Sequence, residues 1–161
     1  MKGTNNIDFT YQFNNKNRST GFFLLYILSS VLFIGVIVLF ILFNFNLPLV
    51  LTVLTAICYF IFLHLLKPSY IELLISETEI QVNYYSVATA IKSYQSIVID
   101  RYDFNSYEIK NRYNGLQKQL ILTVKSKLGL ADYPPISVSI LSKRELNQVI
   151  IVLSKMTDNR K

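Results

Sequence analysis

Two long stretches without charge constrain this chain more than any other feature. Residues 21–43 contain no Asp, Glu, Lys or Arg, and neither do residues 48–66. At 1.5 Å per helical residue the first stretch extends about 35 Å, and the hydrocarbon core of a bilayer is about 30 Å thick. Neither stretch has a polar face, and the rest of the chain is too small to cover two such helices in a soluble core. We therefore predict two transmembrane helices, 21–43 and 48–66, that form a hairpin.

The orientation of this hairpin follows from the basic residues beside it. Lys16 and Arg18 precede the first helix and Lys67 follows the second, while the turn at residues 44–46 has no basic residue. Basic residues accumulate on the cytoplasmic side of transmembrane helices. We expect a multi-pass protein of the plasma (inner) membrane with cytoplasmic N- and C-termini.

Composition limits the classes of partner. The 161 residues carry a formal net charge of +6, and residues 1–68 and 69–161 each contribute half of it. Nucleic-acid-binding proteins concentrate such charge in a patch or stripe, so no nucleic-acid partner is expected. The single cysteine, Cys58, lies inside the second apolar stretch and excludes an intrachain disulfide.

The chain beyond residue 70 shows the alternation of apolar and polar residues that is typical of half-buried strands. Asn114-Gly115 is a strong hairpin signal, whereas Gly129 and Pro134-Pro135 predict a loop over residues 128–135. The predicted strands are 70–75, 80–85, 91–94, 96–100, 107–112, 119–125 and 136–140.

A helix is predicted after the last strand. Ser142 and Glu145 have the spacing of a capping box, in which each side chain satisfies a free backbone N–H of the other residue. An apolar stripe follows at positions i, i+3, i+4 and i+7, formed by Leu146, Val149, Ile150 and Leu153. The fold class is thus a membrane α-hairpin followed by an α+β domain. That domain is an antiparallel β-barrel or sandwich of about seven strands, closed by the C-terminal helix.

These elements divide the chain into four parts. A cytosolic N-terminal segment (1–20) precedes the hairpin (21–66), and a cytosolic domain (70–156) precedes a short tail (157–161). Within the first part, Ile7, Phe9, Tyr11 and Phe13 alternate with polar residues and predict a strand at 7–13. Either this strand joins the cytosolic domain, or the segment is a disordered tail whose aromatic rings rest on the lipid headgroups.

Two stretches resemble a known family. Residues 70–85, and the segment Tyr133-Pro134-Pro135-Ile136-Ser137-Val138-Ser139-Ile140-Leu141-Ser142-Lys143, are similar to the pleckstrin-homology-like (PH-like) domains of bacterial membrane proteins. Two transmembrane helices often precede such domains, and the second segment resembles one in small two-helix membrane proteins of Bacteroidetes. The family often carries a Trp near its middle strands, where this chain has Tyr94. The resemblance implies a PH-like fold for 70–156 and a role in the assembly or regulation of membrane complexes.

Residues that could act in catalysis, or bind a cofactor or metal, are few or lie in unsuitable positions. His64 and Cys58 both belong to the second apolar stretch, so neither a Ser–His–Asp nor a Cys–His arrangement can form in the domain. The five glycines form no phosphate-binding motif. The acidic pairs Glu77/Glu79 and Asp100/Asp103 are typical of solvated turns and strand ends. We expect no catalytic site, no cofactor and no metal.

Two functions remain, besides the less favoured one of an enzyme with an unrecognised site. The first is a non-enzymatic, membrane-tethered binding module that presents a sheet edge to a peptide, to a protein partner in the membrane, or to a second copy of the chain. The alternative is the sensing of an anionic lipid surface, which attracts nearby basic side chains by about 1 kcal/mol each. The candidate contact residues are Lys110, Arg112, Lys118, Lys125 and Lys127.

Overall fold

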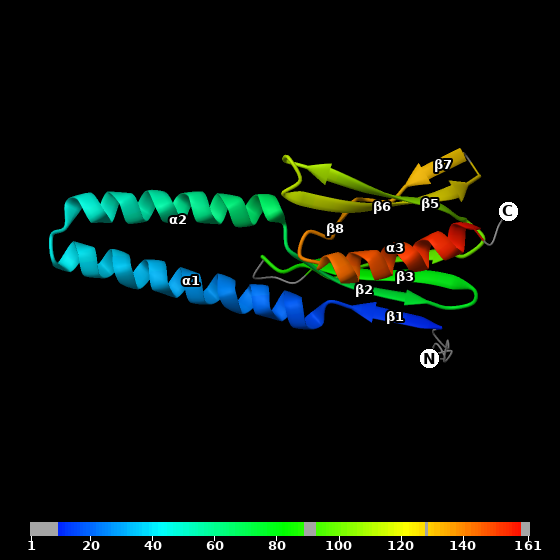
Figure 1. The fold of residues 1–161 in the computed structure, drawn as a ribbon, viewed down its shortest axis with the longest axis horizontal. Helices are drawn as coiled ribbons and strands as arrows, with labels where there is room; N and C mark the ends of the chain where they lie inside the picture. Colours follow the sequence, from blue (N-terminus) through cyan, green and yellow to red (C-terminus); the bar gives the residue numbers. More distant parts are fainter. Residues whose placement is uncertain (1–9, 89–92, 128, 159–161) are drawn as a thin grey trace.

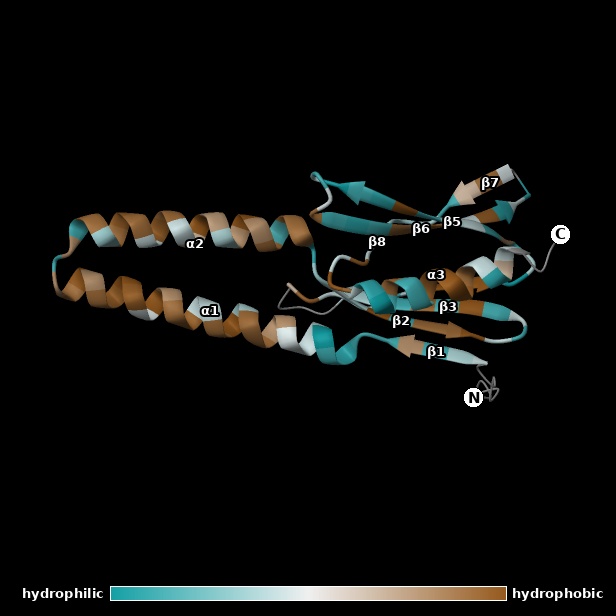
Figure 2. Ribbon diagram, viewed as in Figure 1, coloured by the Kyte–Doolittle hydropathy of each residue, from teal (hydrophilic) through white to brown (hydrophobic). Residues whose placement is uncertain are grey.

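The structure is a computed structural model that describes residues 10–88, 93–127 and 129–158. Two long helices, α1 (Lys16–Leu42) and α2 (Asn46–Leu66), form an antiparallel hairpin that projects from one end of a β-rich domain (Figure 1). Both helices are long and apolar enough to cross a membrane. Hydrophobic residues make up most of the hairpin, as the colouring of the ribbon in Figure 2 shows. Most of this apolar surface is exposed, and exposed apolar surfaces of this size are typical of sites that contact a membrane or another protein.

The helix bounds differ slightly from the predicted spans. α1 begins at Lys16, five residues before the apolar stretch, because the polar first turn continues directly from a strand. α2 begins at Asn46, after a turn in which Asn44 adopts a left-handed conformation with φ 55°. Aromatic rings pack the two helices together, as in the edge-to-face pair of Tyr26 and Phe60 with ring centroids 5.7 Å apart.

The first sheet contains four antiparallel strands in the order β1-β2-β3-β4. They are β1 (Tyr11–Asn14), β2 (Ser69–Ile75), β3 (Glu79–Ser86) and β4 (Gln95–Asp100). β1 pairs with β2, with Phe13 opposite Leu73, so the N-terminal segment does join the domain. Its described strand covers 11–14; residues 7–9 of the predicted strand lie outside the described residues. Residues 91–92 of another predicted strand also lie outside them, and Ser93 and Tyr94 are not in a strand.

The second sheet is formed by β5 (Phe104–Arg112), β6 (Gln117–Ser126), β7 (Gly129–Asp132) and β8 (Ile136–Ser137). The predicted hairpin at Asn114-Gly115 joins β5 to β6. The prediction of a loop over 128–135 was wrong for residues 129–132, because β7 pairs with the end of β6; residues 133–135 are not in a strand, and residue 128 lies outside the described residues. All four residues of β7 are exposed, so main-chain pairing forms it without any apolar alternation. β8 has two residues where five were predicted, because the chain turns at Val138–Leu141 towards the last helix.

The two sheets are separate in the described parts of the chain. β4 and β5 are consecutive but do not pair, so these residues form no closed barrel. Helix α3 (Lys143–Asp158) lies along the open side between the sheets (Figure 1). Its Leu146, Val149 and Leu153 belong to the same buried core as Leu73 of β2 and Phe104 of β5. The core therefore holds both sheets and α3 together.

Candidate functional site at the hairpin-facing end of the domain

Both helices of the hairpin join the domain through very short connections. One residue, Asn15, separates β1 from α1, and two residues, Lys67 and Pro68, separate α2 from β2. We call this end of the domain, from which the hairpin projects, the hairpin-facing end. The hairpin is therefore attached to the first sheet at two neighbouring strands without a flexible linker.

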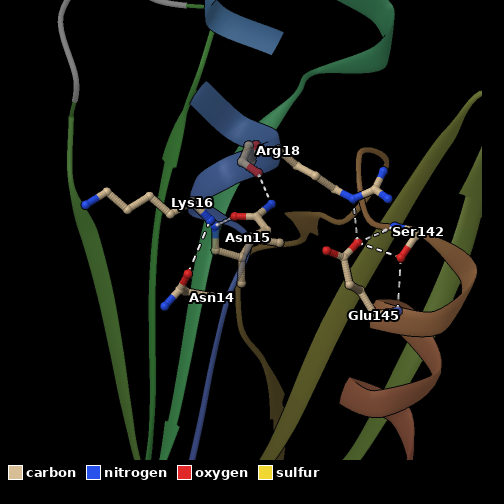
Figure 3. Close-up of polar contacts among 8 residues, drawn as sticks. Asn14, Asn15, Lys16, Arg18, Ser142 and Glu145 are labelled. Atoms are coloured by element: carbon tan, nitrogen blue, oxygen red, sulfur yellow. Dashed lines mark hydrogen bonds and ion pairs between the residues drawn. The ribbon is translucent and has the colours of Figure 1, made fainter. Parts of the chain in front are cut away.

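Asn15 links the two connections by hydrogen bonds (Figure 3). Its side chain is 2% exposed. The amide Nδ2 donates to the carbonyl oxygen of Ser69 at 3.0 Å, and Oδ1 accepts from the N–H of Ile71 at 2.8 Å. Its own N–H donates to the Ile71 carbonyl at 3.2 Å. An Asn side chain can act as donor and acceptor at once, so Asn15 continues the β1–β2 ladder after the main chain has turned into α1.

A second contact joins α1 to α3. Arg18 Nε lies 2.8 Å from Oε2 of Glu145, in the first turn of α3 (Figure 3). The predicted capping box is present, because the N–H of Ser142 donates to Glu145 Oε2 at 2.7 Å and the N–H of Glu145 donates to Ser142 Oγ at 3.2 Å. Burial raises the pKa of the Glu145 carboxyl, but the bonds from Ser142 and the charge of Arg18 outweigh it and hold this pKa below its usual value.

Buried polar side chains gather at the hairpin-facing end. Of the seven buried polar residues in the described chain, only Ser76 lies at another turn of the domain. Ser137 lies close to the end of α2, where its Oγ is 3.4 Å from the carbonyl oxygen of Leu66. This end of the core is thus polar, while its middle is apolar. The six residues are Asn15, Ser19, Ser69, Gln117, Gln119 and Ser137.

A cavity of 560 Å³ opens among several of these polar residues. It lies between the end of α2, the last residues of β3, the start of β4 and the β5–β6 hairpin. Its lining includes Gln117, which is 2% exposed and whose Nε2 atom has no hydrogen-bond partner among the described residues. Buried donors in native proteins almost always have a partner, so this amide marks a position where one is missing.

The charge around this cavity has one sign. Its basic side chains are His64 and Lys67 at the end of α2 and Arg112 at the end of β5. The described residues that line it include no Asp and no Glu. Neither Lys67 nor Arg112 has an ion-pair partner in the described parts of the chain. The cavity is therefore suited to an anionic group.

A cluster of tyrosines adjoins the cavity. The rings of Tyr70 and Tyr85 stack with centroids 4.7 Å apart, and the ring of Tyr94 lies 4.6 Å from that of Tyr85. Burial raises the pKa of the Tyr70 and Tyr85 hydroxyls, so both stay neutral at physiological pH. They line a second hollow of 340 Å³ together with Lys16 and Glu72.

The five basic residues singled out from the sequence do not form one patch. Arg112 lines the cavity, while Lys110 and Lys118 lie on the same hairpin and are opposite Gln119 and Asn111. Lys110 also pairs with Glu108 at 3.3 Å.

The other two basic residues lie elsewhere. Lys125 and Lys127 lie at the opposite end of β6, where they line a separate cavity of 700 Å³ together with Asp100 and Asp103. The acidic residues there offset the basic ones. Only the three residues of the β5–β6 hairpin therefore lie near the hairpin-facing end.

The outer edge of β4 is another feature with binding potential. No strand in the described chain pairs with this edge, because β4 is the last strand of its sheet. Ile97 and Ile99 face the core, whereas Val98 is 52% exposed between them. Unpaired strand edges offer a row of main-chain donors and acceptors to another chain. The cavity that Lys125 and Lys127 line also reaches Val98, Ile99 and Asp100 of this strand.

Sequence reasoning did not find two residues of this site. Asn15 lies between a strand and a helix, where Asn usually caps the helix, and its bonds to β2 cannot be read from the sequence. Gln117 precedes the predicted strand 119–125, and its burial at the start of β6 depends on contacts that the sequence does not reveal. Among the described residues, no three His, Cys, Asp or Glu side chains lie close enough together to hold a metal ion.

No protein-family model, no curated protein and no solved structure matches this chain. Its function therefore has to be inferred from the geometry of the described residues.

Proposed function

We propose that this chain is a non-enzymatic, membrane-tethered binding module. In this proposal the hairpin crosses the plasma (inner) membrane twice, and both termini are cytoplasmic. The domain is PH-like and presents the outer edge of β4 to a protein partner in the same membrane. The observation that carries the proposal is the unpaired edge of β4, with its exposed Val98 between two core residues.

Pairing with a strand of a partner is a common way for such an edge to bind a protein. Main-chain hydrogen bonds supply affinity, and pockets for alternate side chains supply specificity. The cavity beside Val98, Ile99 and Asp100 is placed to receive such side chains. It is lined by both acidic and basic residues, Asp100 and Asp103 with Lys125 and Lys127, which favours a partner segment of mixed charge.

Attachment of the domain to the hairpin also supports this function. Asn15 ties the start of α1 to the start of β2, and Arg18 ties α1 to α3. A domain held in this way keeps a constant orientation to the bilayer. It therefore presents β4 to membrane partners at a constant height.

Site-specific photo-crosslinking of the full chain in its native membranes tests the proposal. A photoreactive phenylalanine analogue replaces Val98 in one variant and, as a matched control, Ile151 on α3, which is 53% exposed. We expect a defined adduct with one membrane protein from position 98 and none from position 151. A Val98→Lys substitution should weaken the interaction, because a lysine on an edge strand opposes strand pairing. Equal adducts at both positions, or none at position 98, would contradict the proposal.

The second candidate function is the sensing of an anionic lipid surface. Lys110, Arg112 and Lys118 favour it, because they lie on the β5–β6 hairpin near the end of α2. Lys125 and Lys127 lie at the other end of β6 and contribute less to such a surface. Binding that depends on anionic lipid and weakens with salt is expected of this function.

A further inference from the structure

We propose that the 560 Å³ cavity at the hairpin-facing end binds the phosphate group of an anionic phospholipid from the leaflet on the domain's side. This inference rests on the membrane placement of the hairpin and deepens the second candidate function, since it names one site and one ligand class. It is independent of the partner edge on β4. The cavity and that edge share strand β4 but use different residues, Gln95 and Val98.

The position of the cavity brings it to the bilayer surface. His64 and Lys67 belong to the last turn and the C-cap of α2, so the apolar helix leads directly to the rim. One turn earlier, Ile61 and Phe62 are exposed on α2. Acyl chains can lie along this apolar surface while the headgroup enters the cavity. A soluble ligand has no acyl chains and would leave this apolar surface of α2 uncovered.

The charges of the lining select for an anion. Arg112 and Lys67 are two basic side chains without an ion-pair partner in the described chain, and no acidic residue is among the described residues that line the cavity. Arg is well suited to phosphate because its planar guanidinium donates two parallel hydrogen bonds to phosphate oxygens. A zwitterionic headgroup would also bring its ammonium group to this basic rim. Phospholipids with a net negative charge are therefore favoured over neutral ones.

Polar groups deeper in the cavity complete the site. Gln117 Nε2 is a buried donor without a partner among the described residues, and it belongs to a residue that lines the cavity. Ser69 and Ser137 line the same space, and their hydroxyls already donate to the carbonyl oxygens of Lys67 and Leu66. A phosphate oxygen accepts several hydrogen bonds and would satisfy the Gln117 amide. The site therefore combines positive charge at its rim with one neutral donor inside, the Gln117 amide.

Native mass spectrometry of the full chain released from lipid nanodiscs tests this inference. The nanodiscs contain phosphatidylcholine with a minor fraction of phosphatidylglycerol, and the readout is the phosphatidylglycerol retained per chain. We expect preferential retention of one phosphatidylglycerol by the unmodified protein. Retention in proportion to the bulk composition would contradict the inference.

One variant and a matched control locate the site. Arg112→Gln removes an exposed charge at the rim, and we expect retention to weaken by about tenfold or more. Arg144→Gln removes one exposed charge from the first turn of α3, outside the lining, and retention should be unchanged. If both variants lose retention equally, the attraction is a diffuse surface effect and the cavity is not the site.

Gln117→Leu distinguishes a ligand contact from a structural role. Because the amide has no internal partner in the described residues, Leu should leave thermal stability in pure phosphatidylcholine unchanged and still weaken retention of phosphatidylglycerol. An equal loss of stability in both lipids would overturn this part of the inference.

A soluble probe separates the two sources of phosphate. Glycerol 3-phosphate is added to the protein in nanodiscs of pure phosphatidylcholine. The lipid assignment predicts no stabilisation at millimolar concentration, because the acyl contacts along α2 are missing. Stabilisation equal to that by phosphatidylglycerol would overturn the lipid source. A failed lipid test with an intact crosslink at position 98 would refute this inference alone.

Discussion

At the scale of single residues, the side chain of Asn15 joins the start of α1 to the start of β2. A side chain of one amide group holds the main chain of β2 at Ser69 and Ile71, where no backbone partner from β1 remains. The asparagine before it, Asn14, is exposed and accepts only a longer bond of 3.3 Å from the N–H of Lys16. These two adjacent residues of the same type form a natural pair for comparison.

Asn15→Ala should destabilise the protein strongly. It leaves a buried carbonyl and a buried N–H without partners, which costs about 2–4 kcal/mol. The midpoint of thermal unfolding in nanodiscs should fall by roughly 10 °C or more. Asn14→Ala is the control and should change this midpoint little. Equal effects of the two substitutions would show that Asn15 does not act through its buried bonds.

The Glu145 carboxyl should make stability depend on acid pH. Its pKa is lowered in the folded state, so its contribution is fully present above the ordinary carboxyl pKa and is lost as the pH falls through the lowered value. Glu145→Gln keeps a capping side chain but loses the charge beside Arg18, which should cost about 1 kcal/mol at neutral pH. Unfolding midpoints measured from neutral to acid pH should converge for the two proteins. Arg18→Gln, which keeps the capping box, should have a smaller effect.

At the scale of elements, the parts that sequence predicts well are those whose side chains alternate or repeat. β2 is buried at every second residue, and α3 has its capping box and apolar stripe, so both were predicted close to their bounds. β7 was missed because it is held by main-chain pairing and one side-chain bond from Thr123 to Asp132, and its four exposed residues show no apolar alternation. The cavity was missed for a different reason. It depends on bringing the end of α2 to the β5–β6 hairpin, which no local pattern reveals.

β1 is the element whose contribution can be tested most directly. Phe13 is buried in the core, and the strand covers the edge of β2. Deletion of residues 2–14 should therefore expose β2 and make the domain sensitive to protease at low protease concentrations. Limited proteolysis of the purified protein in detergent measures this, with Tyr11→Ala as a milder comparison. Unchanged protease resistance would mean that β1 is dispensable for the domain.

At the scale of the whole molecule, the hairpin and the domain extend in opposite directions from one junction. Both described ends of the chain lie on the domain side, far from the turn between α1 and α2 (Figure 1). If the hairpin spans a bilayer, this arrangement requires the domain and both ends to share one side. The basic residues Lys16, Arg18 and Lys67 at the junction favour the cytoplasm for that side.

Cysteine labelling in whole cells tests this topology. Cys58→Ser removes the native thiol, and single cysteines then replace Leu47 beside the helix turn or Tyr102 in the domain, which are 73% and 83% exposed. A membrane-impermeant maleimide should label position 47 in intact cells. Position 102 should be labelled only after the cells are opened. The reverse pattern would place the domain outside and contradict the proposed localisation.

The short connections at Asn15 and at Lys67-Pro68 have a consequence for how such a protein meets its partners. A domain on a flexible linker samples many positions and tilts, and binding to a partner then costs the entropy of this freedom. If the hairpin spans a membrane and the domain binds a partner there, this freedom has already been lost during folding, so the search for the partner is confined to two dimensions and one rotation. Lengthening either connection would leave every contact surface intact and still slow the encounter.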